Sequence, residues 1–296
     1  MSLLVPPPRS YLYVPGSDPR MMEKALSTDA DALVFDLEDA VAPNRKGVAR
    51  EHVAEVLRSR PRKPIIVRVN AVDSGLIDAD IAAIAGPWLA AVRLPKTASP
   101  EHVRHVADGL ARLGCDAGIQ CLLESALGIE RAFDIARAHE RVIGVGLGEA
   151  DLRADLGVSG DSGLAYARAR IVVAARAAGL PGPTQSVYTD IRDLDGLRCS
   201  SEEGKGMGFM GRSVIHPAQI AVVNEVFTPT EDEVRRARDL VDRLDKAAVA
   251  GTGAFALEDG HFVDRAVVEA ARRTLALVLQ RRILPIATKS RFCARS

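Results

Sequence analysis

The sequence has 296 residues, enough for one large domain or two small ones with a sizeable core. Lys plus Arg and Asp plus Glu number 39 each, so the chain lacks the basic surplus typical of proteins that bind nucleic acid. No apolar run approaches the length that spans a bilayer, and the start, MSLLVPPPRS, does not resemble a signal peptide. The four cysteines show no CxxC spacing, which argues against a zinc site or a disulfide framework. We expect a cytoplasmic protein with no nucleic-acid or membrane partner.

Short apolar runs alternate with longer helical patterns along most of the chain. The expected strands lie at residues 11–15, 32–39, 65–70, 90–96, 118–125, 142–151, 183–190 and 208–215. Apolar residues recur at helical spacing over 45–58, 76–85, 99–112 and 126–138. Strands that alternate with helices predict a parallel sheet covered by helices, and their number favours a closed (β/α)8 TIM barrel. An open doubly wound sheet is the alternative, although the glycines of GVGLGEAD are spaced by two and do not form the G-x-G-x-x-G turn of a dinucleotide site.

The pattern changes near residue 228. A long, charged amphipathic helix is expected over 228–250, a Gly-rich segment over 251–264 and a second helix over 264–282. We therefore divide the chain into a catalytic barrel domain at 1–228 and a C-terminal extension at 229–296. The extension is too small to bury a core of its own.

The segment VFDLEDAV, residues 34–41, ends a buried strand with three carboxylates, those of Asp36, Glu38 and Asp39. Burying like charges together is costly unless cations or hydrogen-bond donors answer them. In a parallel barrel the functional groups gather at the C-terminal ends of the strands, and Arg68 and Lys96 end two later strands. Acids and bases are therefore expected to meet at one end of the barrel. Ion pairs that only hold loops are the alternative for each residue.

Among the acids, Glu124 and Asp151 are the best candidate metal ligands. They follow neighbouring strands in Gly-containing contexts, ESALG and GLGEADL, with no His or Cys nearby. Two carboxylates of this kind suit a hard cation such as Mg²⁺, completed by waters and substrate oxygens. The alternative for Asp151 is the N-cap of a short helix at 152–156, and for Glu124 it is a salt bridge to Lys96 or Arg68.

Several motifs occur together in a fixed order. They are RSYLYVPGS, DLEDAVAPNRKGVAR, VRVN, LPK, ES-x-x-G, GLGEADL and GFMGRSVIHPAQI. Over residues 9–282 they resemble the citrate lyase β-subunit-like family, which includes malyl-CoA, β-methylmalyl-CoA and citramalyl-CoA lyases. The resemblance implies a (β/α)8 barrel whose C-terminal extension packs on a neighbouring subunit and completes its active site. Homotrimers or hexamers are the assemblies that it implies.

The same resemblance implies a metal-dependent carbon–carbon lyase. Its substrate would be a small β-hydroxyacyl-CoA such as malyl-CoA, citramalyl-CoA or citryl-CoA. The retro-Claisen or aldol-type reaction would yield, or in reverse consume, a keto acid and an acyl-CoA. Mg²⁺, or Mn²⁺ in its place, would be held by Glu124 and Asp151, and Arg68 would face the thioester. Asp264 would be the acid/base delivered across the subunit interface, whereas spacing alone predicts an N-cap of the last helix.

Coenzyme A forms part of such a substrate, and basic residues near the N-terminus are candidates to bind it. The expected substrate or CoA contacts are Arg9, Tyr13, Arg20, Lys24 and Lys96, with Tyr13 stacking and the arginines and lysines binding phosphates or the substrate. Ordinary surface residues on the first helix are the alternative for Arg20 and Lys24.

Glu38 and Asp39 are expected to support the site rather than to ligate the metal. Each would contact a base at the end of the barrel or a metal-bound water, and so would orient Arg68 or Lys96.

Two other functions stay open at this point. The protein could hydrolyse the same CoA thioesters, or condense them with release of free CoA. It could also be a β subunit that acts only within a citrate lyase complex. A substrate site that looks complete favours an enzyme that acts alone.

Overall fold

The computed structural model describes residues 7–249, 255–256, 262–263 and 265–283. These fall into two compact units, Pro7–Phe227 and a unit that begins at Thr228, and each is described by itself. No helix in the described part of the chain is both long and apolar enough to cross a membrane.

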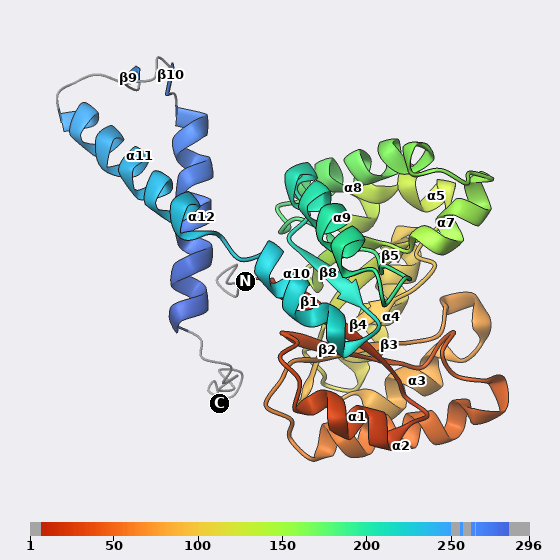
Figure 1. Cartoon of the computed structure of the whole chain (residues 1–296). Helices are drawn as coiled ribbons and strands as arrows, with labels where there is room; N and C mark the ends of the chain where they lie inside the picture. The colour runs from red at the N-terminus through yellow and green to blue at the C-terminus, as the bar shows by residue number, and fades with distance from the viewer. Residues whose placement is uncertain (1–6, 250–254, 257–261, 264, 284–296) are drawn as a thin grey trace. The chain divides into compact units, whose positions relative to one another are not determined.

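Eight parallel strands close into a barrel in the first unit (Figure 1). Each strand pairs with its neighbours in chain order, and β1 also pairs with β8, so the sheet has no open edge. The strands are β1 (Ser10–Pro15), β2 (Ala32–Asp36), β3 (Ile65–Arg68), β4 (Leu89–Leu94), β5 (Gly118–Leu123), β6 (Val142–Leu147), β7 (Thr184–Gln185) and β8 (Gly211–Val214). The predicted (β/α)8 TIM barrel is confirmed, and the open doubly wound sheet is excluded.

Helices follow the strands and cover the outside of the barrel (Figure 1). The longer ones are α1 (Pro19–Leu26), α2 (Lys46–Arg58), α3 (Ile77–Ile84), α4 (Pro100–Arg112), α7 (Glu149–Leu156), α8 (Ala165–Ala177) and α9 (Leu194–Met207). Shorter helices are α5 (Ala126–Glu130), α6 (Ala132–Ala136) and α10 (Ile220–Val226), with 3-10 turns at η1 (Pro43–Arg45), η2 (Val72–Ser74), η3 (Asp161–Leu164) and η4 (Pro217–Gln219).

Local sequence signals fix the ends of these helices. The carboxylate of Asp18 caps α1 by accepting a hydrogen bond from the Met21 N–H at 3.0 Å. Pro100 opens α4, where a missing N–H costs nothing. Beyond the end of α4, Gly114 adopts a left-handed φ of 62°, a conformation that ends a helix.

The two faces of β2 have different surroundings. Leu33, Phe35 and Leu37 are fully buried in the main core, which lies between the barrel and its helices. Val34 belongs to a second cluster inside the barrel, and Asp36 shares its face because side chains alternate along a strand. The apolar and acidic side chains of this segment therefore lie on opposite faces, and its carboxylates point to the barrel interior and its C-terminal end.

Three elements differ from the expected ranges. The seventh strand is only Thr184–Gln185; Pro183, which lacks an N–H group, precedes its start, and the expected residues 186–190 lie outside it. The sixth strand stops at Leu147, so Glu149 and Asp151 lie in the first turn of α7. The helix expected over 126–138 is divided into α5 and α6 at Arg131.

The second unit contains the two helices expected in the C-terminal extension. These are α11 (Glu231–Val249) and α12 (Arg265–Ile283), which contact each other. Between them β9 (Phe255–Ala256) and β10 (Phe262–Val263) pair as antiparallel strands. The packing of this extension on a neighbouring subunit stays a prediction.

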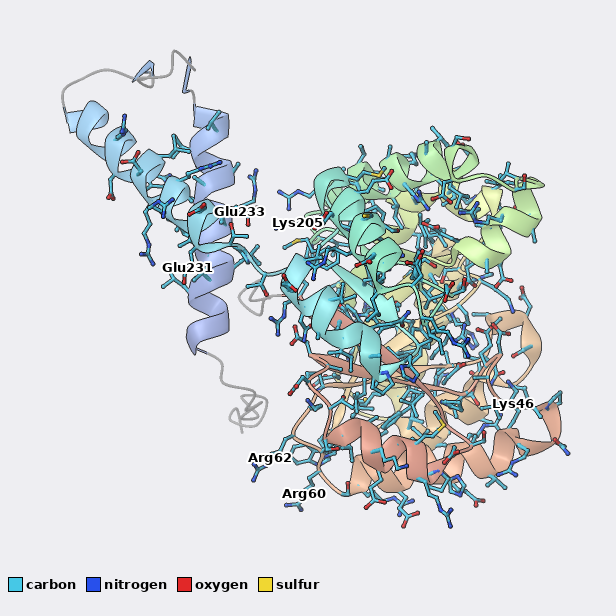
Figure 2. All side chains as sticks on the ribbon, viewed as in Figure 1. Lys46, Arg60, Arg62, Lys205, Glu231 and Glu233 are labelled. Atoms are coloured by element: carbon cyan, nitrogen blue, oxygen red, sulfur yellow. The ribbon has the colours of Figure 1, made fainter. Side chains whose placement is uncertain are left out.

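Lys46, the first residue of α2, holds the segment that follows β2. Its ammonium, labelled in Figure 2, donates to the carbonyl oxygens of Leu37 and Glu38 and to Asn70 Oδ1, each at 2.7 Å. Three acceptors satisfy the three donors of an ammonium group. The backbone that carries Glu38 is thereby fixed to the end of β3.

A buried carboxylate extends this network to α3. Asp80 is fully buried, accepts hydrogen bonds from the backbone N–H and the side-chain amide of Asn70 at 2.8 and 2.7 Å, and pairs with Arg50 Nε at 2.6 Å. Removing one partner of a buried ion pair leaves the other charge uncompensated. Asp80 therefore contributes to the stability of the barrel on the side that carries Arg68.

Replacing Asp80 by Ala should lower the free energy of unfolding by about 3–5 kcal/mol, because Arg50 and Asn70 lose a buried partner. The matched control is Asp78→Ala on the same helix, since Asp78 is 70% exposed and pairs only with His105 among the interactions found. That change should cost less than about 1 kcal/mol. Urea denaturation of both variants measures the difference, and equal costs would contradict this account of Asp80.

Candidate active site

The C-terminal ends of β2 to β6 bring charged side chains together at one end of the barrel, here called the rim. The rim residues are Asp36 at the end of β2, Glu38 and Asp39 after it, Arg68 in β3, Lys96 after β4, Glu124 after β5 and Asp151 in α7. They form two connected parts, an acidic cluster around Arg68 and a pocket that contains Glu124.

Arg68 is the centre of the first part. Its Nε and Nη2 donate to the two oxygens of Asp36 at 2.7 and 2.6 Å, a bidentate pair in which Asp36 is 1% exposed. Its Nη1 lies 3.1 Å from Glu38 Oε2 and 3.3 Å from Asp39 Oδ2. Burial lowers the pKa of Arg68, but the hydrogen bonds with Asp36 and the nearby negative charges together outweigh it, so the pKa is raised and the guanidinium stays charged.

Lys96 joins this cluster to the pocket. Its ammonium donates to Glu38 Oε1 at 2.9 Å, and its backbone N–H donates to Glu124 Oε2 at 2.6 Å. The hydrogen bond with Glu38 raises the pKa of Lys96. Burial raises the pKa of Glu38, although the charge of Arg68 opposes the rise. Glu38 therefore bridges the two bases, which is the contact expected for it from the sequence.

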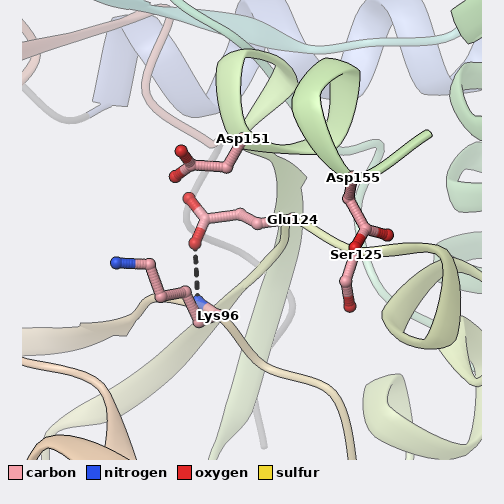
Figure 3. Close-up of a pocket in the computed structure, with 5 residues that line it drawn as sticks. All are labelled: Lys96, Glu124, Ser125, Asp151 and Asp155. Carbon is pink, nitrogen blue, oxygen red and sulfur yellow. Dashed lines mark hydrogen bonds between the residues drawn. The ribbon is translucent and has the colours of Figure 1, made fainter. Parts of the chain in front are cut away.

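A cavity of about 340 Å³ opens at the rim and is lined by Lys96, Glu124, Ser125, Asp151 and Asp155. Figure 3 shows the carboxylates of Glu124 and Asp151 turned toward one another, with the Lys96 ammonium on the same side. Burial raises the pKa of Glu124 to about 7, and the charges of Glu38 and Asp151 add to the rise. The hydrogen bond from the Lys96 N–H and the charge of Arg68 oppose this rise but do not cancel it.

Gly148 makes room for Glu124. A Cβ atom added at Gly148 would lie 2.1 Å from Glu124 Oε1 and 2.5 Å from its Cγ. The glycine that ends the GVGLG segment therefore forms one wall of the space that the Glu124 carboxylate occupies. The spacing of two that distinguishes this segment from a dinucleotide-binding turn places Gly146 and Gly148 beside Leu122 and Glu124 of the neighbouring strand.

The residues present fit a hard divalent cation. Oε2 of Glu124 is engaged by the Lys96 amide, which leaves Oε1 on the side of Asp151 (Figure 3). In the described part of the chain no group of three His, Cys, Asp or Glu residues could by itself hold a metal. Two carboxylates with room beside them match Mg²⁺, which keeps waters and substrate oxygens as its other ligands.

Two residues expected to contact CoA lie elsewhere. Arg9 precedes β1, so it is at the opposite end of the barrel, where it forms a bidentate pair with Asp31 at 2.7 and 2.8 Å. Tyr13 lies inside the barrel, with Arg68 5.3 Å from its ring centroid and its hydroxyl accepting from Arg93 Nη1 at 3.1 Å. The position in β1 turns the Tyr13 ring inward, so the expected stacking on the nucleotide is wrong for this residue. The Arg9 expectation is wrong because β1 begins, rather than ends, beside it.

Arg20 and Lys24 were also expected to contact CoA, and both are exposed on α1. They are four residues apart and so lie on one face of that helix. Asp151 is the third residue of α7, and Gly148 occupies the N-cap position, so the alternative N-cap interpretation of Asp151 is wrong. Asp264 lies outside the described residues, and its role stays a prediction.

Two acidic residues of the site have roles that sequence reasoning missed. Asp36 is the closest partner of Arg68, and the signal for it was its place on the same strand face as Glu38. Asp155 lines the pocket and accepts a hydrogen bond from the Ala126 N–H at 2.6 Å, which ties α7 to the segment after Glu124. Its spacing of four from Asp151 on one helix face was the available signal.

This fold and this rim define a (β/α)8 barrel enzyme with a carboxylate pair suited to a divalent cation. The chain belongs to the HpcH/HpaI aldolase/citrate lyase family, whose family model matches residues 9–217.

Individual proteins similar to this chain carry different functional names. It is 38% identical over 279 residues to a (3S)-malyl-CoA thioesterase of Cereibacter sphaeroides, covering 91% of this chain and 94% of that protein. It is 37% identical over 281 residues to the citrate lyase subunit beta of Escherichia coli, covering 90% of this chain and 92% of that protein. A crystal structure of CitE from Mycobacterium tuberculosis in complex with magnesium, acetoacetate and coenzyme A is similar with a TM-score of 0.75 and 30% identity, covering 93% of this chain and 98% of that one.

Replacing Gly148 by Ala should weaken Mg²⁺ binding by about 10–100-fold, because the added methyl displaces the Glu124 side chain and leaves the backbone in place. The control is Gly144→Ala on the same strand, where an added Cβ meets no atom within 4 Å. Isothermal titration with Mg²⁺ measures both dissociation constants. Equal constants for the two variants would refute the role of Gly148.

Mg²⁺ affinity should fall as the pH drops below about 7. The pKa of Glu124 is raised to about 7 in the metal-free protein, so protons compete with the metal below that pH and not above it. One competing proton weakens binding by about tenfold per pH unit. Titrations at several pH values should show a plateau on the alkaline side, and Glu124→Gln should bind weakly throughout. An affinity that stays constant down to about pH 5.5 would contradict the assignment of Glu124.

Proposed function

We propose that the protein is a Mg²⁺-dependent carbon–carbon lyase that acts on a small β-hydroxyacyl-CoA. The products would be a keto acid and a shorter acyl-CoA, formed by a retro-Claisen or aldol-type cleavage or consumed in the reverse direction. Candidate substrates are malyl-CoA, citramalyl-CoA and citryl-CoA. Membership of the aldolase/citrate lyase family and the complex of a similar protein with magnesium and coenzyme A support the proposal.

One observation carries the proposal: Lys96 joins a carboxylate pair suited to Mg²⁺ to a guanidinium suited to an oxyanion. Its backbone contacts Glu124 and its side chain contacts Glu38, which in turn lies against Arg68. The cleavage develops negative charge at two places, the hydroxy-acid end and the thioester end. Two separate but connected charged groups match that requirement.

At the hydroxy-acid end, Glu124 and Asp151 would hold the metal. The bound cation would supply Lewis acidity that favours the alkoxide of the substrate hydroxyl. The carboxylate pair would also orient the substrate through the metal, since the hydroxyl and carboxylate of a 2-hydroxy acid form a chelating pair. No covalent nucleophile is required.

At the thioester end, Arg68 would stabilise the enolate oxygen. Asp36 holds the Nε and Nη2 edge of the guanidinium in a fixed orientation, so the remaining donors are preorganised. Asp264 is proposed to protonate the enolate carbon in cleavage and to remove a proton from the acyl-CoA methyl in condensation. It would reach the site from a neighbouring subunit in a homotrimer or hexamer.

The CoA moiety is proposed to contact α1. Arg20 and Lys24 form an exposed basic pair there. Such a pair would bind phosphate groups as point charges. Lys96, whose ammonium is held by Glu38, is better placed to organise the rim than to bind a phosphate.

A thioesterase is the second candidate function. The observation that favours it is the similarity to a protein named (3S)-malyl-CoA thioesterase over 91% of this chain. The same metal and the same guanidinium could serve a thioester hydrolysis. A subunit that acts only within a citrate lyase complex is the third candidate, supported by the similarity to a citrate lyase subunit beta.

Incubation of the protein with Mg²⁺ and each candidate CoA ester should release a keto acid and a shorter acyl-CoA, measured by mass spectrometry. A thiol reagent in the same assay detects free CoA, which the carbon–carbon cleavage itself does not release. Release of free CoA alone would favour the thioesterase. No turnover of any ester by folded, metal-loaded protein would refute the lyase proposal and favour the dependent subunit.

Glu124→Ala and Asp151→Ala should each reduce turnover by more than about 100-fold while the melting temperature stays close to that of the wild type, because both side chains serve the metal. Asp134→Ala is the control, since Asp134 is an exposed acid on α6. Turnover and thermal unfolding are measured on the same preparations. Wild-type rates in either metal-ligand variant would show that the metal assignment is wrong.

A further inference from the structure

Lys96 has an unusual backbone conformation. Its φ is 48°, and Lys96 and Arg60 are the non-glycine residues with positive φ in the described part of the chain. A left-handed conformation is strained for a residue with a Cβ atom and persists only where the surroundings impose it. Such strain within a site calls for a functional explanation.

The neighbours of Lys96 hold this conformation in place. Pro95 is buried, and Thr97 is fully buried. The Thr97 N–H donates to the Leu122 carbonyl at 2.9 Å, and its hydroxyl donates to the Leu94 carbonyl at 2.8 Å. These hydrogen bonds anchor the chain directly after Lys96 and offset part of the strain of the turn.

The left-handed turn aims the two ends of Lys96 at two carboxylates. The backbone N–H donates to Glu124 Oε2 at 2.6 Å (Figure 3). The side-chain ammonium donates to Glu38 Oε1 at 2.9 Å. A backbone N–H that donates to a carboxylate makes a charge-assisted hydrogen bond and fixes which oxygen stays available. Here the oxygen left available is Oε1, on the side of Asp151.

We infer that Lys96 is a positioning residue that acts through its left-handed backbone, orienting the Glu124 carboxylate for the metal while its side chain ties that carboxylate to the Glu38–Arg68 cluster. The claim that Lys96 orients a metal ligand follows from the geometry of Glu124. The claim that Lys96 couples Glu124 to Arg68 rests on the lyase activity proposed above. Lys96 thus fixes the position of Glu124, which would bind the metal, relative to Arg68, which would bind the oxyanion.

Two substitutions separate the backbone from the side chain. Both Lys96→Ala and Lys96→Gly remove the ammonium, so any effect of its charge on Mg²⁺ binding is the same in the two variants. Only Gly adopts a left-handed φ without strain, whereas Ala keeps the strain and loses the anchor at Glu38. The turn should therefore be retained in Lys96→Gly and should relax in Lys96→Ala.

The expected result is a Mg²⁺ dissociation constant at least about fivefold higher for Lys96→Ala than for Lys96→Gly, measured by isothermal titration without a CoA ester. Arg60→Ala and Arg60→Gly form the matched control pair, because Arg60 has a φ of 60°, is exposed and lies beyond the far end of α2 from Lys46 (Figure 2). In that pair the Gly variant should melt at a higher temperature than the Ala variant, with no difference in Mg²⁺ affinity. Equal affinities for the two Lys96 variants would overturn the inference.

A second readout tests the side chain. If the protein turns over a CoA ester, Lys96→Gly should lower kcat while Mg²⁺ affinity is kept. The reason is that the Lys96 side chain no longer connects Glu38 and Arg68 to the residues that bind the metal. An unchanged kcat would overturn the coupling. Failure of the wild type to turn over any ester would count against the lyase proposal alone, since the Mg²⁺ titrations would still decide the role of the backbone.

Discussion

Mutual repulsion among carboxylates is the constraint on which the rim depends. The acids at this end of the barrel are Asp36, Glu38, Asp39, Glu124 and Asp151. Arg68 is paired with all three acids at the end of β2, and these contacts hold its guanidinium in place. In the part of the chain that the structure describes, no side-chain cation is bonded to the Glu124 carboxylate, whose pKa is raised by burial to about 7. The part of the rim that lacks a cation is therefore the part that suits a metal.

Backbone features, rather than further side chains, shape the carboxylate pocket. Gly148 provides the space for Glu124, and the left-handed turn at Lys96 provides its hydrogen-bond donor. Asp155 fastens α7 to the segment that follows Glu124, which brings Asp151 to the pocket. Glu124, Lys96 and Gly148 each lie within two residues of the end of a barrel strand, so the rigid sheet limits how far each part of the pocket can move.

Periodicity predicted the barrel because each strand has an apolar face that must be buried, and the acidic face of β2 followed from the same alternation. The grouping of Glu38 with Arg68 and Lys96 also followed, since parallel strands end at one rim. Arg9 was assigned to CoA from its charge, although the strand expected at 11–15 already places it before the start of that strand. Tyr13 was misplaced because its neighbours across the barrel, Arg68 and Arg93, come from distant segments. Backbone dihedral angles such as that of Lys96 are set by tertiary anchors, which sequence patterns do not reveal.

The central claim is that Glu124 and Asp151 form the metal site of a lyase whose oxyanion group is Arg68. A crystal structure with Mn²⁺ and a 2-oxo acid tests it most directly, because the anomalous signal of Mn²⁺ locates the metal without assumptions about the protein. We expect one peak about 2.1 Å from an oxygen of Glu124 and an oxygen of Asp151, with the oxo acid completing the coordination. A peak on Asp36 or Glu38 instead, or no peak at the rim in protein that binds the metal in solution, would contradict the account.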